Sequence, residues 1–219
     1  MQSIKAILDG REITARPGQT VLQAARDNGM YIPALCDHPA LSPFGACRVC
    51  LVEVEKNPKL LPACTTPLVE GMVISSRSPK VLEARRAVVE LILVRHPLDC
   101  FSCPSNGKCE LQNVAYELGI TESRFREDVD VQKGEHKLED ANPFYVRDMD
   151  KCILCGRCVR TCDELARYHA IDFQQRGVKT MVHPPIGKDL EHSDCVFCGQ
   201  CVQMCPVGAL YEKSSVGQG

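Results

Sequence analysis

The sequence has few aromatic residues and no marked excess of charge of either sign. It contains no tryptophan and only 5% aromatic residues, so one large aromatic core is not expected. Its 26 basic and 28 acidic residues give a net charge of -2, and no cluster of Lys and Arg favours binding to nucleic acid. Several small cores, held together by something other than aromatic packing, are therefore the expected organisation.

Long apolar segments are also missing. The longest aliphatic run covers residues 91–94, and residues 1–10 carry Lys5 and Asp9 in place of the apolar centre of a secretory signal. We therefore expect no membrane span and a cytoplasmic location, where a reducing environment leaves thiols free to bind metal. The sequence shows no G-x-G-x-x-G motif, no flavin motif, and no Ser-His-Asp or paired-carboxylate arrangement that would indicate catalysis on this chain.

Cysteine, by contrast, is abundant. The fifteen cysteines fall into four groups along the chain, of four, three, four and four residues. An odd number of thiols cannot all pair as disulfides, and clustered thiols in a reducing compartment are typical of metal sites. If one histidine completes the group of three, each group supplies the four ligands of one metal centre.

The two C-terminal groups have the most specific spacing. Both fit C-x2-C-x2-C-x3-C, with an offset of 43 residues between them, and only the second is followed by proline, Pro206, where the first has Asp163. This is the spacing of bacterial two-cluster ferredoxins, in which the fourth cysteine of each group binds the other cluster. Two [4Fe-4S] clusters with crossed ligand sets are thus predicted, one bound by Cys152, Cys155, Cys158 and Cys205, the other by Cys162, Cys195, Cys198 and Cys201. Paired zinc knuckles, which usually have two C-x2-C halves and a wide gap, are the alternative.

The N-terminal group has the spacing C-x10-C-x2-C-x13-C and consists of Cys36, Cys47, Cys50 and Cys64. The small residues Gly45 and Ala46 let backbone N–H groups approach a bound cluster closely. The surrounding pattern predicts a small β-grasp sheet with one helix. Strands are expected over residues 3–8 and 12–15, joined by an Asp9-Gly10 turn, and over residues 49–54 and 72–75; the helix is expected to begin after an N-cap at Thr20 and to stop near Asn28 and Gly29. A zinc site is the alternative for this group as well.

The group of three cysteines needs a fourth ligand. Ser78 and Pro79 begin a predicted helix over residues 81–94, and Pro97 ends it, which brings His96 to the helix tip just before the cysteines. The predicted ligand set is His96, Cys100, Cys103 and Cys109. The other histidines near cysteines, His38 and His192, lie beside complete sets and are not expected to bind metal.

These motifs together resemble a known family. The N-terminal spacing and the segment from Gly107 to Gln112 (Gly-Lys-Cys-Glu-Leu-Gln) resemble the large peripheral subunit of respiratory NADH dehydrogenases and the N-terminal part of iron-only hydrogenases. In that family the first group binds a [2Fe-2S] cluster, and a histidine with three cysteines binds a [4Fe-4S] cluster. The resemblance covers nearly the whole chain. No cysteine follows Cys205, so the chain looks most similar to the short diaphorase-type subunit of soluble NAD(P)-linked hydrogenases.

The motifs and the resemblance imply an α+β chain in three parts. These are a β-grasp [2Fe-2S] domain over residues 1–78, a linking helix with a [4Fe-4S] domain over residues 79–140, and a two-[4Fe-4S] ferredoxin-like domain over residues 141–219. The implied function is non-catalytic relay of single electrons, through one [2Fe-2S] and three [4Fe-4S] clusters, between a flavin- and NAD(P)-binding subunit and a catalytic hydrogenase.

The resemblance also implies the partners. FMN and NAD(P) are expected on a flavoprotein subunit, next to a small thioredoxin-like [2Fe-2S] subunit and the catalytic hydrogenase subunits, with soluble ferredoxin as a further partner if the complex bifurcates electrons. Three alternatives stay open: the relay subunit of an NAD-linked formate dehydrogenase, a free ferredoxin-like carrier, and a zinc-stabilised interaction protein.

Overall fold

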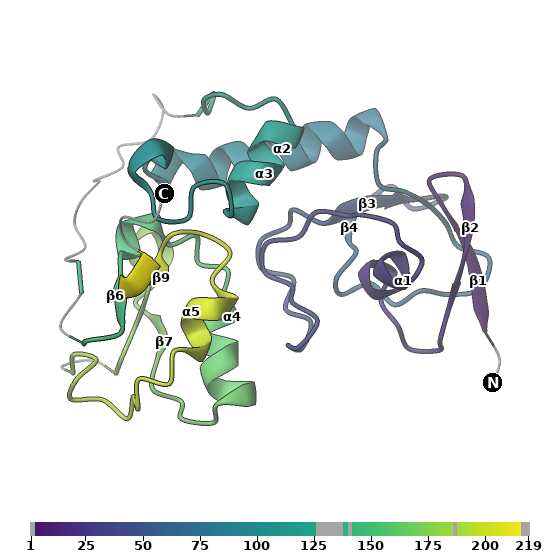
Figure 1. Ribbon diagram of the computed structural model, residues 1–219. Coiled ribbons are helices and arrows are strands. Elements are labelled where there is room, and N and C mark those ends of the chain that lie inside the picture. The colour runs from purple at the N-terminus through teal and green to yellow at the C-terminus, as the bar shows by residue number, and fades with distance from the viewer. Residues whose placement is uncertain (1–2, 126–137, 140–141, 186–187, 216–219) are drawn as a thin grey trace. The chain divides into compact units, whose positions relative to one another are not determined.

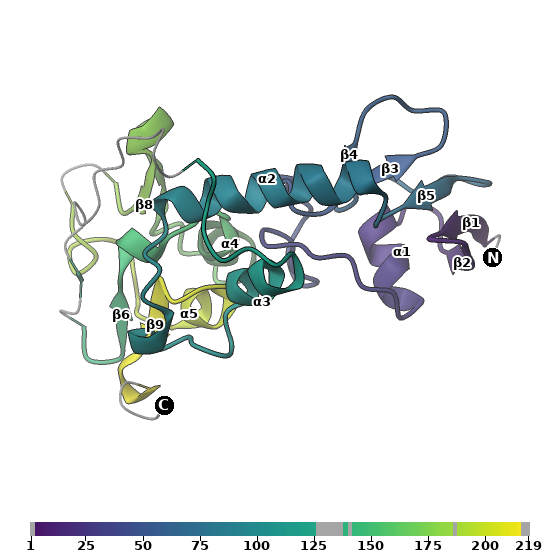
Figure 2. The same ribbon diagram turned by 90° about the horizontal axis from the view of Figure 1, so that it is seen from above.

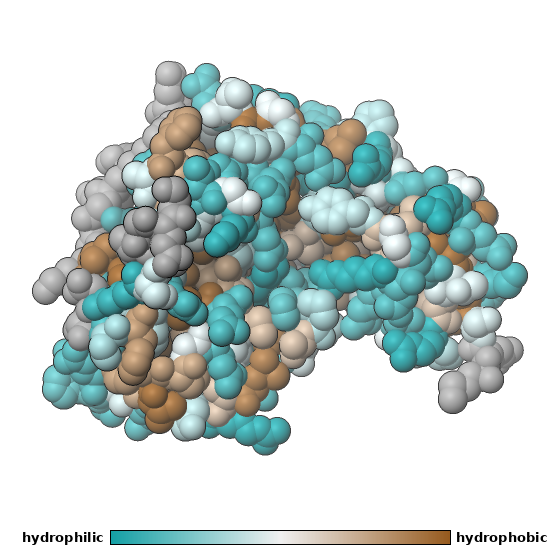
Figure 3. All heavy atoms as spheres, in the orientation of Figure 1, coloured by the Kyte–Doolittle hydropathy of each residue, from teal (hydrophilic) through white to brown (hydrophobic). Residues whose placement is uncertain are grey.

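A computed structural model describes residues 3–125, 138–139, 142–185 and 188–215 (Figure 1). The chain divides into two compact units, residues 1–89 and 90–219, and the boundary falls inside helix α2 (Pro79–Arg95). The three domain ranges expected from the cysteine groups stay a prediction. No helix in the described ranges is both long and apolar enough to cross a membrane. On the face drawn in Figure 3, hydrophobic residues are interspersed with hydrophilic ones.

The N-terminal unit is built on a five-stranded sheet in the order β2-β1-β5-β3-β4. Its strands are β1 (Ile4–Leu8), β2 (Arg11–Ala15), β3 (Leu51–Val54), β4 (Leu61–Pro62) and β5 (Val73–Ser75). Strand β1 pairs antiparallel with β2 and parallel with β5, whereas β3 pairs antiparallel with both β4 and β5. This is the strand order of a β-grasp sheet. The two-residue strand β4 is absent from the sequence-based prediction.

Local sequence accounts for the first turn and for helix α1 (Val21–Asp27). Asp9 and Gly10 both have positive φ, 50° and 80°, as a two-residue hairpin of the type I′ family requires. At the start of α1 the hydroxyl of Thr20 accepts a hydrogen bond from the Gln23 N–H, and the Gln23 side chain accepts one from the Thr20 N–H. This capping box satisfies two backbone donors that the helix leaves unpaired.

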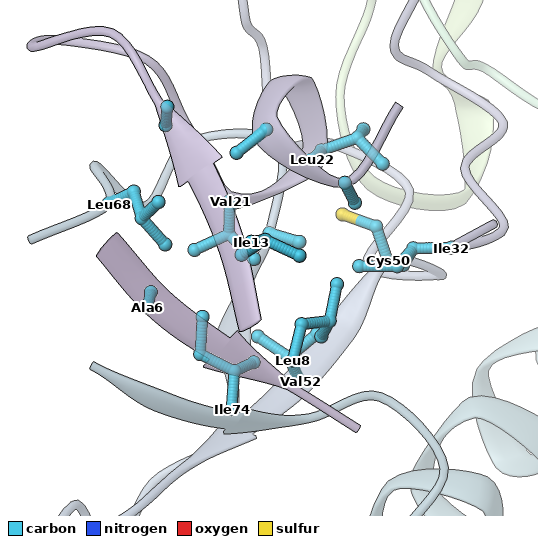
Figure 4. Packing of buried hydrophobic residues seen from close by; sticks show 14 of the residues in the cluster. Ala6, Leu8, Ile13, Val21, Leu22, Ile32, Cys50, Val52, Leu68 and Ile74 are labelled. Atoms are coloured by element: carbon cyan, nitrogen blue, oxygen red, sulfur yellow. The ribbon is translucent and has the colours of Figure 1, made fainter. Parts of the chain in front are cut away.

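The core of this unit forms where α1 packs against the sheet. Alternate residues of β1 and β2 are buried, as the two-residue period of a strand dictates. Figure 4 shows the central side chains of this cluster, which include Leu8, Ile13, Val52 and Ile74, and Cys50 lies among them. One predicted metal ligand is therefore part of the hydrophobic core.

Helix α2 follows the limits that its sequence predicts (Figure 2). The Ser78 hydroxyl accepts a hydrogen bond from the Val81 N–H at 3.3 Å and caps the first turn. The helix ends at Arg95, directly before His96 and Pro97, because proline disfavours a helical conformation in the residue before it.

The C-terminal unit is assembled from much shorter elements. After α2 come helices α3 (Glu110–Glu117), α4 (Arg157–Arg160) and α5 (Gln200–Met204). Strand β6 (Tyr145–Arg147) pairs with β9 (Leu210–Glu212), and β7 (Asp172–Gln174) pairs with β8 (Met181–His183). The helical turns are η1 (Cys100–Ser102), η2 (Met149–Lys151), η3 (Thr161–Leu165), η4 (Gly177–Lys179) and η5 (Lys213–Ser215). Elements this short bury little apolar surface of their own.

Candidate metal centres

The structure brings the four N-terminal cysteines together. Cys36 lies in the loop after α1, Cys47 and Cys50 precede β3, and Cys64 follows β4. The thiols of Cys47 and Cys64 hydrogen-bond to Cys36, and the thiol of Cys64 also to Cys50, so that the four sulfurs form a connected chain. Three of the four cysteines are fully buried.

Hydrogen bonds between these thiols shift their pKa values in opposite directions. The bonds from Cys47 and Cys64 lower the pKa of Cys36 to about 2. The same bonds raise the pKa of Cys47 and of Cys64, since each keeps its proton as the donor. A buried set that already stabilises a thiolate suits a bound cationic metal, which replaces the shared protons.

Arg85 is a residue of this site that the sequence analysis missed. It reaches from α2, is 2% exposed, and donates from Nε to the Val49 carbonyl and from Nη2 to the Leu51 carbonyl, both at 2.9 Å. Nη2 also donates to the Ser76 carbonyl at 3.1 Å. Val49 and Leu51 flank Cys50, so a fixed positive charge lies beside the predicted ligand. Its sequence signal is its position, one helical turn from the buried Val81 and Val89 on either side.

All eight cysteines of the two C-terminal groups line one cavity in the C-terminal unit. The cavity has about 830 Å³ of empty space, part of it open to solvent, and its other walls are mainly apolar side chains such as Ile171, Val182 and Leu210. It brings together residues from both halves of the repeat. The cysteines are Cys152, Cys155, Cys158, Cys162, Cys195, Cys198, Cys201 and Cys205.

The two cysteine motifs, 43 residues apart in the sequence, also share a backbone conformation. Leu154 and Phe197 occupy equivalent positions, have φ of 54° and 55°, and each donates its N–H to the sulfur two residues earlier, Cys152 or Cys195, at 3.4 Å. Hydrogen bonds from backbone N–H groups stabilise a thiolate. The left-handed backbone at these non-glycine residues carries a cost of about 1–2 kcal/mol each and serves to aim the amide at the sulfur.

The two halves differ at the fourth cysteine. Cys162 lies in η3, a π-helical turn that continues α4, whereas Cys205 follows the end of α5 with an extended backbone, ψ 122°. The difference follows from the next residue: Pro206 disfavours a helical Cys205, while Asp163 lets the helix continue through Cys162. The sulfur of Cys162 accepts a hydrogen bond from the Ala170 N–H at 3.3 Å.

Burial is the main influence on the pKa of four thiols in this cavity. It raises the pKa of Cys152 and of Cys205 to about 11 and that of Cys201 to about 12, and it also raises the pKa of Cys158. Such thiols stay protonated unless a cation offsets the lost hydration. The buried hydroxyl of Tyr145 lies 3.6 Å from the Cys195 sulfur, a contact that the sequence did not indicate.

His96 lies at the tip of α2 with one ring nitrogen unsatisfied. The residue is 9% exposed, and its Nδ1 has no hydrogen-bond partner. Burial lowers its pKa, which favours the neutral imidazole that binds metals. Cys100 begins η1 and Cys103 is its C-cap. Cys109 is the N-cap of α3, where its sulfur accepts a hydrogen bond from the Gln112 N–H at 3.4 Å. The cavity-lining thiols and this unpaired nitrogen are a donor set that fits iron–sulfur clusters.

Hydrogen bonds within the segment from Gly107 to Gln112, which resembles the family, stabilise its conformation. Gly107 has φ 75° and donates its N–H to the Gln112 side-chain oxygen at 3.0 Å. The buried Gln112 amide in turn donates to Asn106 and Tyr116, at 2.9 and 3.1 Å. This network fixes the loop between Cys103 and Cys109.

Described residues do not include a group of three or more His, Cys, Asp or Glu side chains arranged to hold a single metal ion. Comparison with protein families identifies three regions instead. Residues 2–79 match a 2Fe-2S iron-sulfur cluster binding domain, residues 85–124 match the NADH-ubiquinone oxidoreductase-G iron-sulfur binding region, and residues 151–209 match a 4Fe-4S dicluster domain.

Two curated relatives are similar over nearly the whole chain. The HndD subunit of an NADP-reducing hydrogenase from Solidesulfovibrio fructosivorans is 40% identical over 97% of this chain and 36% of its own length. A subunit of the NADH-quinone oxidoreductase from Rickettsia prowazekii is 39% identical over 96% of this chain and 30% of its own length. This chain thus spans only about a third of either relative.

One solved structure is similar over both its own length and that of this chain. It is a chain of an NAD+-reducing [NiFe]-hydrogenase in the H2-reduced state, with 31% identity and a TM-score of 0.89 over 100% of this chain and 91% of that chain. The predictions of a family resemblance and of iron–sulfur domains with mixed α and β structure are confirmed. The chain belongs to the family of iron–sulfur subunits shared by NAD(P)-linked hydrogenases and NADH-quinone oxidoreductases.

Proposed function

We propose that this chain holds four iron–sulfur clusters and relays single electrons through them. Bound clusters of this kind accept and release one electron at a time. The proposed ligand sets are Cys36, Cys47, Cys50 and Cys64 for a [2Fe-2S] cluster; His96, Cys100, Cys103 and Cys109 for a [4Fe-4S] cluster; Cys152, Cys155, Cys158 and Cys205 for a second; and Cys162, Cys195, Cys198 and Cys201 for a third.

The observation that carries the proposal is the shared cavity of the eight C-terminal cysteines. Its walls are mainly apolar, and backbone N–H groups donate to the sulfurs of Cys152, Cys162 and Cys195. Such amides stabilise negative charge that arrives with an electron and so tune the potential of the bound group. The polypeptide thus holds, shields and tunes the centres, and no described residue is needed for a catalytic step.

The names of the relatives support the proposed partners. HndD is named as a subunit of an NADP-reducing hydrogenase, and the solved neighbour belongs to an NAD+-reducing hydrogenase. We propose that this chain passes electrons between a subunit carrying FMN and NAD(P) and a catalytic hydrogenase, with a small thioredoxin-like [2Fe-2S] subunit alongside and soluble ferredoxin as a partner where electrons bifurcate. A cytoplasmic location is part of the same proposal.

Anaerobic purification tests the cofactors directly. We expect brown protein whose visible absorption bleaches with dithionite, and iron and sulfide contents that match one [2Fe-2S] and three [4Fe-4S] clusters. Colourless protein with stoichiometric zinc would overturn the proposal in favour of a zinc-stabilised interaction protein.

Single substitutions test the ligand assignment. Cys205→Ser should damage the cluster of Cys152, Cys155 and Cys158, and Cys162→Ser the other, each seen as loss of one set of electron paramagnetic resonance (EPR) signals. His96→Cys should keep its cluster but lower its midpoint potential, because a thiolate adds a negative charge that imidazole lacks. Loss of only the [2Fe-2S] signal in His96→Cys would contradict the assignment.

Purification from cells at high ionic strength tests the partners. Co-purifying hydrogenase and flavoprotein subunits are the expected result, identified by mass spectrometry. Co-purification of a formate dehydrogenase catalytic subunit instead would indicate that this chain serves a formate dehydrogenase. A stable, functional monomer would favour a free ferredoxin-like carrier.

A further inference from the structure

Within the C-terminal unit, the segment from His96 to Cys109 touches the ferredoxin-like segment through residues that sit next to proposed ligands. The Glu110 N–H donates to the Pro206 carbonyl at 2.9 Å. Glu110 directly follows Cys109, and Pro206 directly follows Cys205. A single backbone hydrogen bond therefore links the residues that adjoin a ligand of each of two proposed clusters.

The same glutamate makes an ion pair across this contact. Arg157 Nη1 lies 2.6 Å from Glu110 Oε1, and Nη2 lies 2.7 Å from Oε2, which is a two-pronged pairing of guanidinium and carboxylate. The Arg157 side chain is 4% exposed, whereas that of Glu110 is 43% exposed. Arg157 itself lies between Cys155 and Cys158.

Two further contacts keep the segments close. A Cβ at Gly208 would lie 2.5 Å from the Cys103 sulfur, so the backbone there approaches this ligand more closely than any side chain permits. Lys151, which precedes Cys152, is buried and lies 3.8 Å from Asp99 and 2.9 Å from Asp148. The ion pair of Arg157 is thus one part of a packed junction between two ligand sets.

A buried guanidinium is costly to hold in the protein interior unless its charge is matched. The carboxylate of Glu110 matches it with fixed geometry. Coulombic interaction at such separations remains substantial in a partly buried site. The positive charge near Cys155 and Cys158 favours an added electron there, and the negative charge next to Cys109 disfavours one.

We propose that the Arg157–Glu110 pair is a positioning and potential-setting contact between the site of His96, Cys100, Cys103 and Cys109 and the site of Cys152, Cys155, Cys158 and Cys205. This inference rests on the proposed function. In the transfer that it serves, one electron leaves the reduced centre at one site and reduces the oxidised centre at the other, with no atom or proton transferred.

Replacing either charged residue by glutamine should shift the midpoint potentials, in opposite directions for the two residues. Arg157→Gln removes a positive charge and should lower the midpoint potentials of the two adjoining [4Fe-4S] clusters, whereas Glu110→Gln removes a negative charge and should raise them. The combined variant should return them towards the unmodified values. The readout is a redox titration followed by EPR on the iron-loaded chain, together with iron content.

A role in packing alone predicts a different outcome. It would change both single variants in the same way, through lost iron, or would leave both potentials unshifted, and either result would overturn the inference. If Arg157→Gln does not retain iron, the midpoint potentials of Glu110→Gln and Glu110→Asp are compared instead. The first should raise the potential and the second, which keeps the charge, should not; equal behaviour of the two would overturn the inference.

The Arg124–Glu90 pair supplies a matched control. It joins an arginine to a fully buried carboxylate at 2.7 Å in the same unit, and neither residue adjoins a cysteine in the sequence. Arg124→Gln should leave the potentials unchanged, and an equal shift there would show a general charge effect and overturn the inference. Absence of [4Fe-4S] clusters in the unmodified chain would overturn the proposed function itself, whereas full clusters with unshifted potentials overturn only this contact.

Discussion

The two units of the chain build cysteine sites in different ways. In the N-terminal unit, Cys50 and Cys64 belong to a hydrophobic core whose larger members, Leu8 and Leu22, are fully buried. In the C-terminal unit, the cysteines of the ferredoxin-like segment pack around a smaller cluster of buried residues such as Tyr145 and Leu210, and they line a cavity. The N-terminal site thus lies within a hydrophobic core, whereas the cysteines of the ferredoxin-like segment occupy the centre of their segment in place of apolar side chains.

Element length follows the same division. A five-stranded sheet and a capped helix supply the backbone hydrogen bonds of the N-terminal unit. The ferredoxin-like segment has strands of three residues in pairs and helices of four and five residues. Elements this short gain little from propensity or packing. We therefore expect bound clusters to contribute more of the folding free energy in the second unit than in the first.

Removal of iron should therefore destabilise the C-terminal unit much more than the N-terminal unit, and this is the largest effect that we expect. Chelation under reducing conditions should unfold the ferredoxin-like segment, because metal binding and folding are coupled where ligands replace a core. The N-terminal sheet should remain folded. Hydrogen–deuterium exchange read by mass spectrometry would show loss of protection in β6 and β9 with protection retained in β1 and β3.

Loss of protection in both units together, or in neither, would contradict this difference between the units. Leu8→Ala provides the reciprocal perturbation. It should cost the N-terminal unit about 3 kcal/mol through lost burial and a cavity, whether or not iron is present.

Arg85→Met tests whether the stability of the N-terminal unit depends on the hydrogen bonds of Arg85 beside the first cysteine site. It should destabilise the N-terminal unit by about 3 kcal/mol, since it leaves three carbonyls next to the site without their donor. Denaturant unfolding measures the change. Lys80→Met on the same helix is the control, because Lys80 is half exposed and its bond to the Pro58 carbonyl should contribute less than about 1 kcal/mol. Equal costs for the two variants would refute this role of Arg85.

The sequence predicted most of what local chemistry determines. The hairpin at Asp9, the capped start of α1 at Thr20 and the end of α2 before Pro97 all depend on neighbours in the chain, and the structure has all three. The cysteine spacing likewise indicated a repeat, which Leu154 and Phe197 show in their backbone.

Contacts between distant segments could not be predicted in this way. Strand β4 is two residues long, too short for any periodic pattern, and forms only because β3 lies beside it. Arg85 and Arg157 are buried by partners far away in the sequence, and the pattern of their neighbours does not indicate this. The arginine at position 157 pairs with Glu110, 47 residues earlier, and no local pattern reports such a contact.

Helix caps offer a smaller difference between the units. Helix α1 starts at Thr20 with a side-chain cap, whereas α4 and α5 start at Gly156 and Gly199, with φ of 72° and 73° and no side-chain cap. Thr20→Ala should lower the free energy of unfolding of the N-terminal unit by about 1 kcal/mol, measured by denaturant titration. Thr20→Ser keeps a hydroxyl and should recover most of that loss; a serine variant as unstable as the alanine variant would mean that the methyl group, not the cap, matters.

The smallest effect that we expect is a pH dependence at the surface of the C-terminal unit. The Asp189 carboxylate contacts the His192 ring, which raises the pKa of His192 and lowers that of Asp189. A raised histidine pKa stabilises the folded state fully below the unfolded pKa, near 6.5, and this gain is lost as pH rises through the folded value. The lowered aspartate pKa acts above its own unfolded value, so the pair is most effective between the two.

Both groups are fully exposed, so solvent screens the pair and its effect on stability should be slight beside that of iron. Hydrogen–deuterium exchange at the His192 ring carbon, followed by mass spectrometry across pH, gives its pKa without interference from paramagnetic iron. Asp189→Asn should return that pKa to the ordinary histidine range, and an unchanged value would show that the carboxylate does not cause the shift. If the variant also left iron retention unchanged across this pH range, the stability of this unit would depend on its interior ligands far more than on its surface charges, as the comparison of the two units requires.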